Sequence, residues 1–163
     1  MFFKFFRREL KPFNTGFLPS KDGHEIYYAE YGNPNGIPVL CFHGGPGGCS
    51  APKHASAFDP KKYRVILHDQ RGCGQSTYQN RFYKNTTADL LADAVRLLKH
   101  LNVTGKVIVR GGSWGATLAL LFAIRYPGCV RRLILNSVFL AGTTDRAWME
   151  NISGDLFYPD IMA

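Results

Sequence analysis

A β-branched run leading into a glycine-flanked serine constrains this chain more than any other feature. Residues 107–109 are Val-Ile-Val, and an alanine- and leucine-rich stretch follows the sequence Gly111, Gly112, Ser113, Trp114, Gly115. This order predicts a strand, a sharp turn and a helix, with glycines where a Cβ atom would clash. We therefore expect Ser113 at the apex of the turn, presented as a nucleophile. The alternative is that these are ordinary turn residues.

A second apolar run, residues 38–42, continues into a glycine-rich loop of His43, Gly44, Gly45, Pro46, Gly47 and Gly48. Such loops let main-chain N–H groups approach a ligand closely, and after a strand they supply a donor to an oxyanion hole. We assign the two donors to the N–H groups of Gly45 and Trp114. His43 is expected to order the loop rather than act as a base, because it lies on the oxyanion side. A loop without catalytic function is the alternative.

A third block, residues 63–76, is again an apolar strand that ends in a polar, glycine-containing loop. Asp69 and Arg71 within it admit two interpretations. They are either an acid and a substrate clamp, or charged side chains at a strand end that hydrogen-bond neighbouring loops together. We favour the second.

Taken together, these blocks resemble the proline iminopeptidase (prolyl aminopeptidase) family of α/β hydrolases. The motifs that carry the resemblance cover most of the chain from about Pro12 onward, and they lie at residues 22–27, 32–36, 43–48, 69–76 and 111–120. The resemblance implies a serine peptidase that removes an N-terminal proline from short peptides without a metal or an organic cofactor.

The fold class expected is α/β, specifically the N-terminal half of an α/β-hydrolase core. Residues 16–20 and 25–31 predict an antiparallel hairpin, after which parallel strands alternate with helices. Thr86 or Thr87 is expected to cap a helix with one apolar face, and residues 130–138 predict the last strand. The expected organisation is a basic, Phe-rich leader (1–11), the core (12–142) and the beginning of a cap region (143–163). We expect the chain to be truncated before the cap and the C-terminal strands.

A serine hydroxyl needs a histidine to accept its proton and a carboxylate to orient that histidine. In α/β hydrolases both follow the serine, the acid first. All five histidines of this chain precede Ser113: His24, His43, His54, His68 and His100. The carboxylates after Ser113 have no histidine behind them: Asp145, Glu150, Asp155 and Asp160. Recruitment of His54 or His68 is a weaker alternative.

We therefore expect a chain with a nucleophile and an oxyanion hole that is inactive alone. Two alternatives stay open: half of a split enzyme completed by a second polypeptide, or a non-catalytic remnant that binds a ligand. An α/β sheet that stops at residue 138 would also expose the edge of its last strand. We expect the isolated chain to be marginally stable or prone to aggregation for that reason.

Composition narrows the remaining function classes. The net charge is +8, but the basic residues are spread without a basic helix or aromatic platform, which argues against nucleic acid. No apolar stretch has the length of a bilayer span, and the leader is expected to be loosely packed rather than membrane-bound. His and Cys lack metal-ligand spacing. No secretory signal is recognisable, so we expect the protein to be cytoplasmic. Its four cysteines are then expected to be reduced thiols: Cys41, Cys49, Cys73 and Cys129.

Overall fold

A mixed β-sheet runs through the protein, whose computed structural model describes residues 10–20 and 22–147. Most strands contain β-branched or aromatic residues, which favour extended backbone. The strands are β1 (Asn14–Pro19), β2 (His24–Gly32), β3 (Ile37–Phe42), β4 (Tyr63–His68), β5 (Thr77–Tyr78), β6 (Val107–Ser113) and β7 (Val130–Val138).

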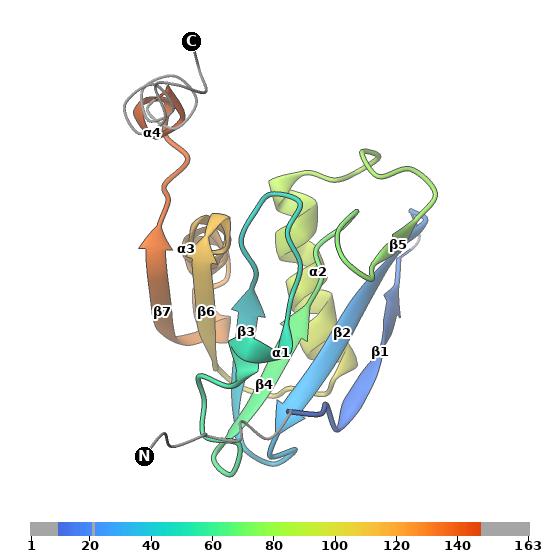
Figure 1. The fold of residues 1–163 in the computed structure, drawn as a ribbon, viewed down its shortest axis with the longest axis vertical. Coiled ribbons are helices and arrows are strands. Elements are labelled where there is room, and N and C mark those ends of the chain that lie inside the picture. Colours follow the sequence, from blue (N-terminus) through green and yellow to red (C-terminus); the bar gives the residue numbers. More distant parts are fainter. Residues whose placement is uncertain (1–9, 21, 148–163) are drawn as a thin grey trace, which may run out of the picture.

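The order of the strands across the sheet is β1-β2-β4-β3-β6-β7, and the short β5 pairs with β2 (Figure 1). β2 is antiparallel to β1, β4 and β5, whereas the pairs β3/β4, β3/β6 and β6/β7 are parallel. The expected antiparallel start followed by parallel strands is therefore confirmed. The carboxyl ends of β3, β4 and β6 lie at one edge of the sheet, where ligand sites form in parallel α/β folds.

The helices are α1 (Pro52–Ala55), α2 (Thr87–His100), α3 (Trp114–Arg125) and α4 (Thr143–Ala147). Thr86 is the N-cap of α2, since its hydroxyl accepts a hydrogen bond from the Asp89 N–H and its own N–H donates to the Asp89 carboxylate. The apolar face expected on this helix is buried: Leu90, Leu91, Ala94, Leu97, Leu98 and Leu101.

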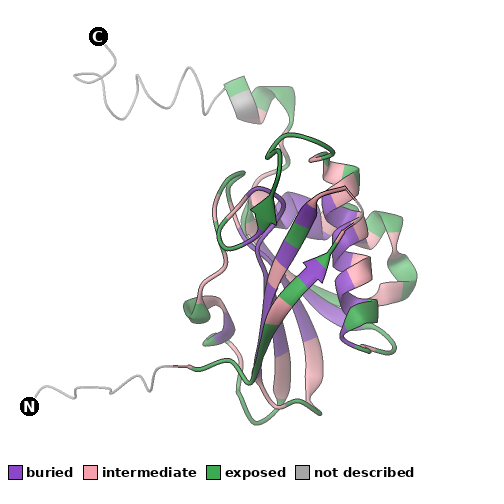
Figure 2. Ribbon diagram, turned by 90° about the vertical axis from the view of Figure 1, so that its right-hand side faces the viewer, coloured by how far each residue is buried: buried purple, intermediate pink, exposed green. Residues whose placement is uncertain are grey.

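The two faces of the sheet are covered unequally. One face packs against α2 and α3 and forms the larger core, with Leu40 and Phe42 of β3 inside it. Val39 and Cys41, which point the other way, belong to a smaller cluster that α1 joins through Ala55. Figure 2 shows the buried residues concentrated in the strands and on the sheet-facing sides of the two long helices.

β7 is the exposed edge of the sheet. Val130 and Leu135 are half-buried, while the other positions of the strand are exposed, including Leu133, Ile134 and Val138. Within the described residues, no strand pairs with its outer side. The uncovered edge predicted from the sequence is therefore present.

Most of the expected leader (1–11) lies outside the described residues, as do residues 148–163 of the expected cap region. α4 begins at Thr143, where that region was expected to start. The division into leader, core and cap stays a prediction.

Candidate active site

Ser113 occupies a strained position at the junction of β6 and α3. Its backbone has φ 53° and ψ −125°, a conformation that residues other than glycine rarely adopt. Ser113 is also exposed. Strain of this kind persists only where the surroundings enforce it, and it is how a strand-to-helix turn presents a nucleophile. The turn predicted for residues 111–115 is thus present, with Ser113 at its apex.

The three glycines of the turn allow close packing around Ser113. A Cβ atom on Gly111 would overlap the carbonyl oxygen of Gly115, and one on Gly115 would overlap that of Phe42 and lie 2.8 Å from that of His43. Gly112 faces the side-chain amide of Asn136, whose Nδ2 would lie 2.6 Å from a Cβ. Close packing, rather than turn flexibility, is therefore what the glycines of this motif provide.

The glycine-rich loop begins where β3 ends, beside the serine-bearing turn. Gly45 has φ +138°, within the region that favours glycine. Trp114 is the first residue of α3, so its N–H has no acceptor within the helix. The assignment of the Gly45 and Trp114 N–H groups to an oxyanion hole stays a prediction.

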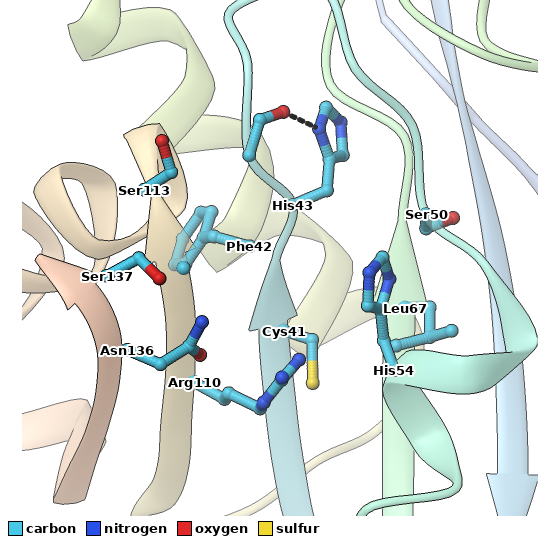
Figure 3. Close-up of a pocket in the computed structure, with 12 residues that line it drawn as sticks. Cys41, Phe42, His43, Ser50, His54, Leu67, Arg110, Ser113, Asn136 and Ser137 are labelled. Atoms are coloured by element: carbon cyan, nitrogen blue, oxygen red, sulfur yellow. Dashed lines mark hydrogen bonds between the residues drawn. The ribbon is translucent and has the colours of Figure 1, made fainter. Parts of the chain in front are cut away.

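The other predicted loop residues divide between two cavities. His43 and Gly44 line a cavity of about 180 Å³ together with Gly112 and Ser113 (Figure 3). Pro46, Gly47 and Trp114 line a second, of about 750 Å³, with residues of the β4–β5 loop. Gly111 and Gly115 line neither of these cavities and contribute instead the close main-chain packing of the turn.

His43 is buried, and both of its ring nitrogens are engaged. The Gln70 N–H lies 2.9 Å from Nε2, and Nδ1 lies 2.8 Å from the carbonyl oxygen of Gly44 (Figure 3). Burial lowers the pKa of His43, although the Gly44 hydrogen bond and the charge of Asp69 oppose this. A neutral ring whose nitrogens both bind main chain orders the loop, and neither nitrogen is available to Ser113.

Of the other four histidines, His54 lines the same cavity as Ser113, whereas His24, His68 and His100 do not (Figure 3). His24 Nε2 bonds the Tyr83 carbonyl at 2.7 Å, and His100 Nε2 lies 3.3 Å from the Tyr28 hydroxyl. His54 Nδ1 accepts from the Ala51 N–H at 3.1 Å.

His68 is buried under Phe42, and burial lowers its pKa to about 4. Over the residues that the structure describes, no histidine is hydrogen-bonded to the Ser113 hydroxyl.

Asp69 connects the loops that follow β3 and β4. Its Oδ1 accepts from the N–H of Ser50 at 2.6 Å and from its hydroxyl at 2.7 Å, and its Oδ2 accepts from the Gln75 N–H at 2.8 Å. All of these donors belong to loops. The loop-binding interpretation of Asp69 is confirmed.

Arg71 is the centre of a buried ion-pair network and is only 4 % exposed. Its Nε and Nη2 bind both carboxylate oxygens of Asp93 at 2.6 and 2.9 Å, and its Nη1 binds Asp22 at 2.7 Å and the Lys84 carbonyl at 2.6 Å. The network joins the β1–β2 turn, the β4–β5 loop and α2. With its donors committed in this way, Arg71 holds elements together and does not clamp a substrate.

Three residues near the site were not singled out from the sequence. Gln70 contacts both the glycine-rich loop and Trp114. It lies between Asp69 and Arg71, whose charges made them the candidates in that block. Asn136 and Ser137 line the cavity beside Ser113, and Ser137 has φ 48°. Their one sequence signal is a pair of polar residues at the end of an apolar strand.

Arg110 lines the same cavity and points toward Cys41 (Figure 3). Burial raises the pKa of the Cys41 thiol to about 12, so this sulfur is protonated and is not a nucleophile. In residues 10–20 and 22–147, no three His, Cys, Asp or Glu side chains are grouped so as to hold a metal ion. Nor does any helix of that part combine the length and apolarity needed to span a membrane.

The sheet order, the strained serine and the glycine-rich loop together define the α/β-hydrolase fold. The model of the alpha/beta hydrolase fold family matches residues 37–156, and the chain belongs to this family. Within it, the resemblance to proline iminopeptidases is confirmed. A probable proline iminopeptidase of Leptolyngbya boryana is 42 % identical over 151 residues, which cover 93 % of this chain and 47 % of that protein.

The proline iminopeptidase of Neisseria gonorrhoeae is 40 % identical over 151 residues, or 92 % of this chain and 48 % of that protein. A solved structure of a proline iminopeptidase-related protein from Thermus thermophilus superposes with a TM-score of 0.65 and 27 % identity. The match covers 75 % of this chain and 43 % of the Thermus chain. The chain thus spans about half the length of the proline iminopeptidases that it matches.

Proposed function

We propose that this chain is the nucleophile-bearing half of a serine hydrolase that releases N-terminal proline from peptides. The observation that carries the proposal is Ser113 at φ 53° beside a loop and a helix start that offer main-chain donors. In acyl transfer, the hydroxyl attacks the scissile carbonyl while these N–H groups stabilise the negative charge that develops on its oxygen. The preference for proline comes from the likeness to proline iminopeptidases.

The general base comes, in this proposal, from polypeptide beyond residue 163, on the same chain or on a second one. Within the described residues, His24, His43, His54 and His100 each have a ring nitrogen bonded to another group, and His68 is buried. None of the five follows Ser113 in the sequence. Without a base, the serine hydroxyl keeps its proton and is a poor nucleophile. The 163 residues alone are therefore inactive.

The compartment that we propose for the protein is the cytoplasm.

The exposed edge of β7 supports this completion by further polypeptide. Its outer main-chain groups are unpaired within the described part of the chain, and Leu133, Ile134 and Val138 are 37, 41 and 55 % exposed. Parallel strands are ordinarily covered on both faces, so an added strand here would extend the sheet and bury apolar surface. This edge favours the split or extended enzyme over the non-catalytic remnant.

Completion of the chain tests the proposal. Residues 1–163 are joined to the part of the Neisseria gonorrhoeae enzyme that follows its matched region, and the folded product is assayed with a chromogenic prolyl amide. We expect turnover that Ser113→Ala abolishes. Ser56→Ala is the matched control, because the Ser56 hydroxyl is exposed, bonds the Lys53 carbonyl and does not line the cavity beside Ser113.

Two outcomes would reject the proposal in different ways. A folded, cooperative fusion without Ser113-dependent turnover of any amide or ester would reject the catalytic function. Serine-dependent turnover of esters or alanyl amides without prolyl amides would retain the hydrolase and reject the proline preference.

A further inference from the structure

Gln70 lies between the two elements that carry the oxyanion donors. It stands two residues beyond the end of β4 and is only 3 % exposed. On one side of it is the loop that begins at His43, and on the other is Trp114 at the start of α3. Gln70 supplies no reacting group to the proposed mechanism. Its buried position between these two elements therefore indicates a function other than chemistry.

The side chain of Gln70 binds both elements at once. Its Nε2 donates to the carbonyl oxygen of His43 at 2.9 Å, and its Oε1 accepts from the Trp114 indole Nε1–H at 3.1 Å. A carbonyl only accepts and an indole N–H only donates, so these partners also fix which end of the carboxamide faces which element. The carboxamide therefore acts as a spacer of fixed length between the loop and the helix.

The main chain of Gln70 adds a second connection. Its N–H donates to His43 Nε2 at 2.9 Å, which places the ring proton on Nδ1, 2.8 Å from the Gly44 carbonyl oxygen. That carbonyl belongs to the same planar peptide unit as the Gly45 N–H. A hydrogen bond that fixes the carbonyl therefore fixes the direction of the N–H as well. Burial lowers the pKa of His43 and keeps its ring in the neutral form that this chain of bonds requires.

We propose that Gln70 is the positioning residue of the oxyanion hole, holding the Gly45 and Trp114 N–H groups at the separation that a tetrahedral intermediate needs. This inference rests on the proposed function. Loss of one oxyanion donor typically lowers kcat about 10²- to 10³-fold, and displacement of a reacting group by about 1 Å costs up to about 10²-fold. By the same reasoning, a donor that is displaced but still present should cost about 10- to 100-fold.

The completed enzyme described above provides the kinetic test. Gln70→Met keeps the volume but removes both side-chain bonds, and Gln70→Glu keeps the acceptor for Trp114 while turning an oxygen toward the His43 carbonyl. We expect kcat per titrated active serine to fall about 10- to 100-fold in both, with KM within about twofold. Binding of prolinal, an aldehyde that forms a tetrahedral adduct with the serine, should weaken in parallel. Gln79→Met is the control, since Gln79 is exposed and follows β5, outside the loop that holds Gln70.

A purely structural function would lower the number of titratable serines without changing kcat per serine, and that result would overturn the inference. Absence of turnover in the unsubstituted enzyme would instead count against the proposed function. The inference is then decided by nuclear magnetic resonance on the folded completed protein. Trp148→Phe removes the second indole of the 163 residues. In that background, Gln70→Met should shift the resonances of the Trp114 indole proton and the Gly45 amide proton together. If either resonance stays in place, Gln70 does not couple the two donors.

Discussion

Gly115, in the first turn of α3, lies against the main-chain carbonyl oxygen of Phe42 at the end of β3, so closely that a Cβ atom would overlap that oxygen. The contact determines how near the serine-bearing turn comes to the loop that starts at His43. A side chain here would push the helix start away from the loop and separate the two elements that form the proposed oxyanion hole.

Gly115→Ala should therefore destabilise the protein by about 3 kcal/mol and remove activity from the completed enzyme. Denaturant unfolding of the completed enzyme measures the first effect. Gly128→Ala is the control, because a Cβ at Gly128 would meet nothing within 4 Å. Equal stability of the two variants would show that the turn has room that the structure does not contain.

Removing Arg71 should leave the buried Asp93 without its main ion-pair partner. Asp93 is 2 % exposed and binds Arg71 through both oxygens, and its remaining partner is the more exposed Arg96. We expect Arg71→Met to cost about 3 kcal/mol, the lower end of the usual penalty for removing one partner of a buried ion pair, because Arg96 still binds Asp93. The double variant Arg71→Met/Asp93→Leu should regain most of that loss, as measured by urea unfolding. A double variant no more stable than the single one would contradict the assignment.

His68 should make the protein sensitive to acid. Burial lowers its pKa from 6.5 to about 4, so the unfolded chain takes up this proton at a higher pH than the native protein does. The native state therefore loses stability as pH falls from about 6.5 to about 4, by about 3 kcal/mol in total.

His68→Phe, which retains an aromatic ring beside Phe42, should lose less stability over this range. Urea midpoints at about pH 7 and about pH 4.5 measure the difference. His100→Gln is the control, because His100 is exposed on α2. Parallel losses in the native protein and in His68→Phe would show that another group dominates the acid response.

Self-association of the 163-residue chain should occur through β7. Leu133 and Ile134 are 37 and 41 % exposed on a strand whose outer side has no partner among the described residues. Lysine at an exposed strand edge opposes edge-to-edge pairing. Ile134→Lys should therefore reduce light scattering and binding of a hydrophobic dye.

Phe82→Lys is the control, because Phe82 is 84 % exposed but lies away from this edge. Equal reductions by both substitutions would mean that association follows general hydrophobicity, not the strand edge. A monomeric native chain that melts cooperatively and binds no dye would contradict the prediction altogether.

The sequence predicts the strands and helices well because local patterns and global fold agree in them. The hairpin, the capped α2 and the turn at Ser113 each carry a local signal, namely alternation, a Thr/Asp capping box or flanking glycines. Neither the Arg71 network nor the Gln70 bonds could be predicted in the same way. Arg71 meets Asp22 and Asp93 across many intervening residues, and Gln70 meets His43 and Trp114 only once three strands lie side by side.

The most direct test of the central claim is a steady-state assay of the 163-residue chain alone with a chromogenic prolyl amide, beside its Ser113→Ala variant. The account predicts that the two proteins release chromophore at the same background rate, because no imidazole in the described part of the chain is hydrogen-bonded to the Ser113 hydroxyl to take its proton. Turnover at enzyme-like rates that disappears with Ser113→Ala would contradict it.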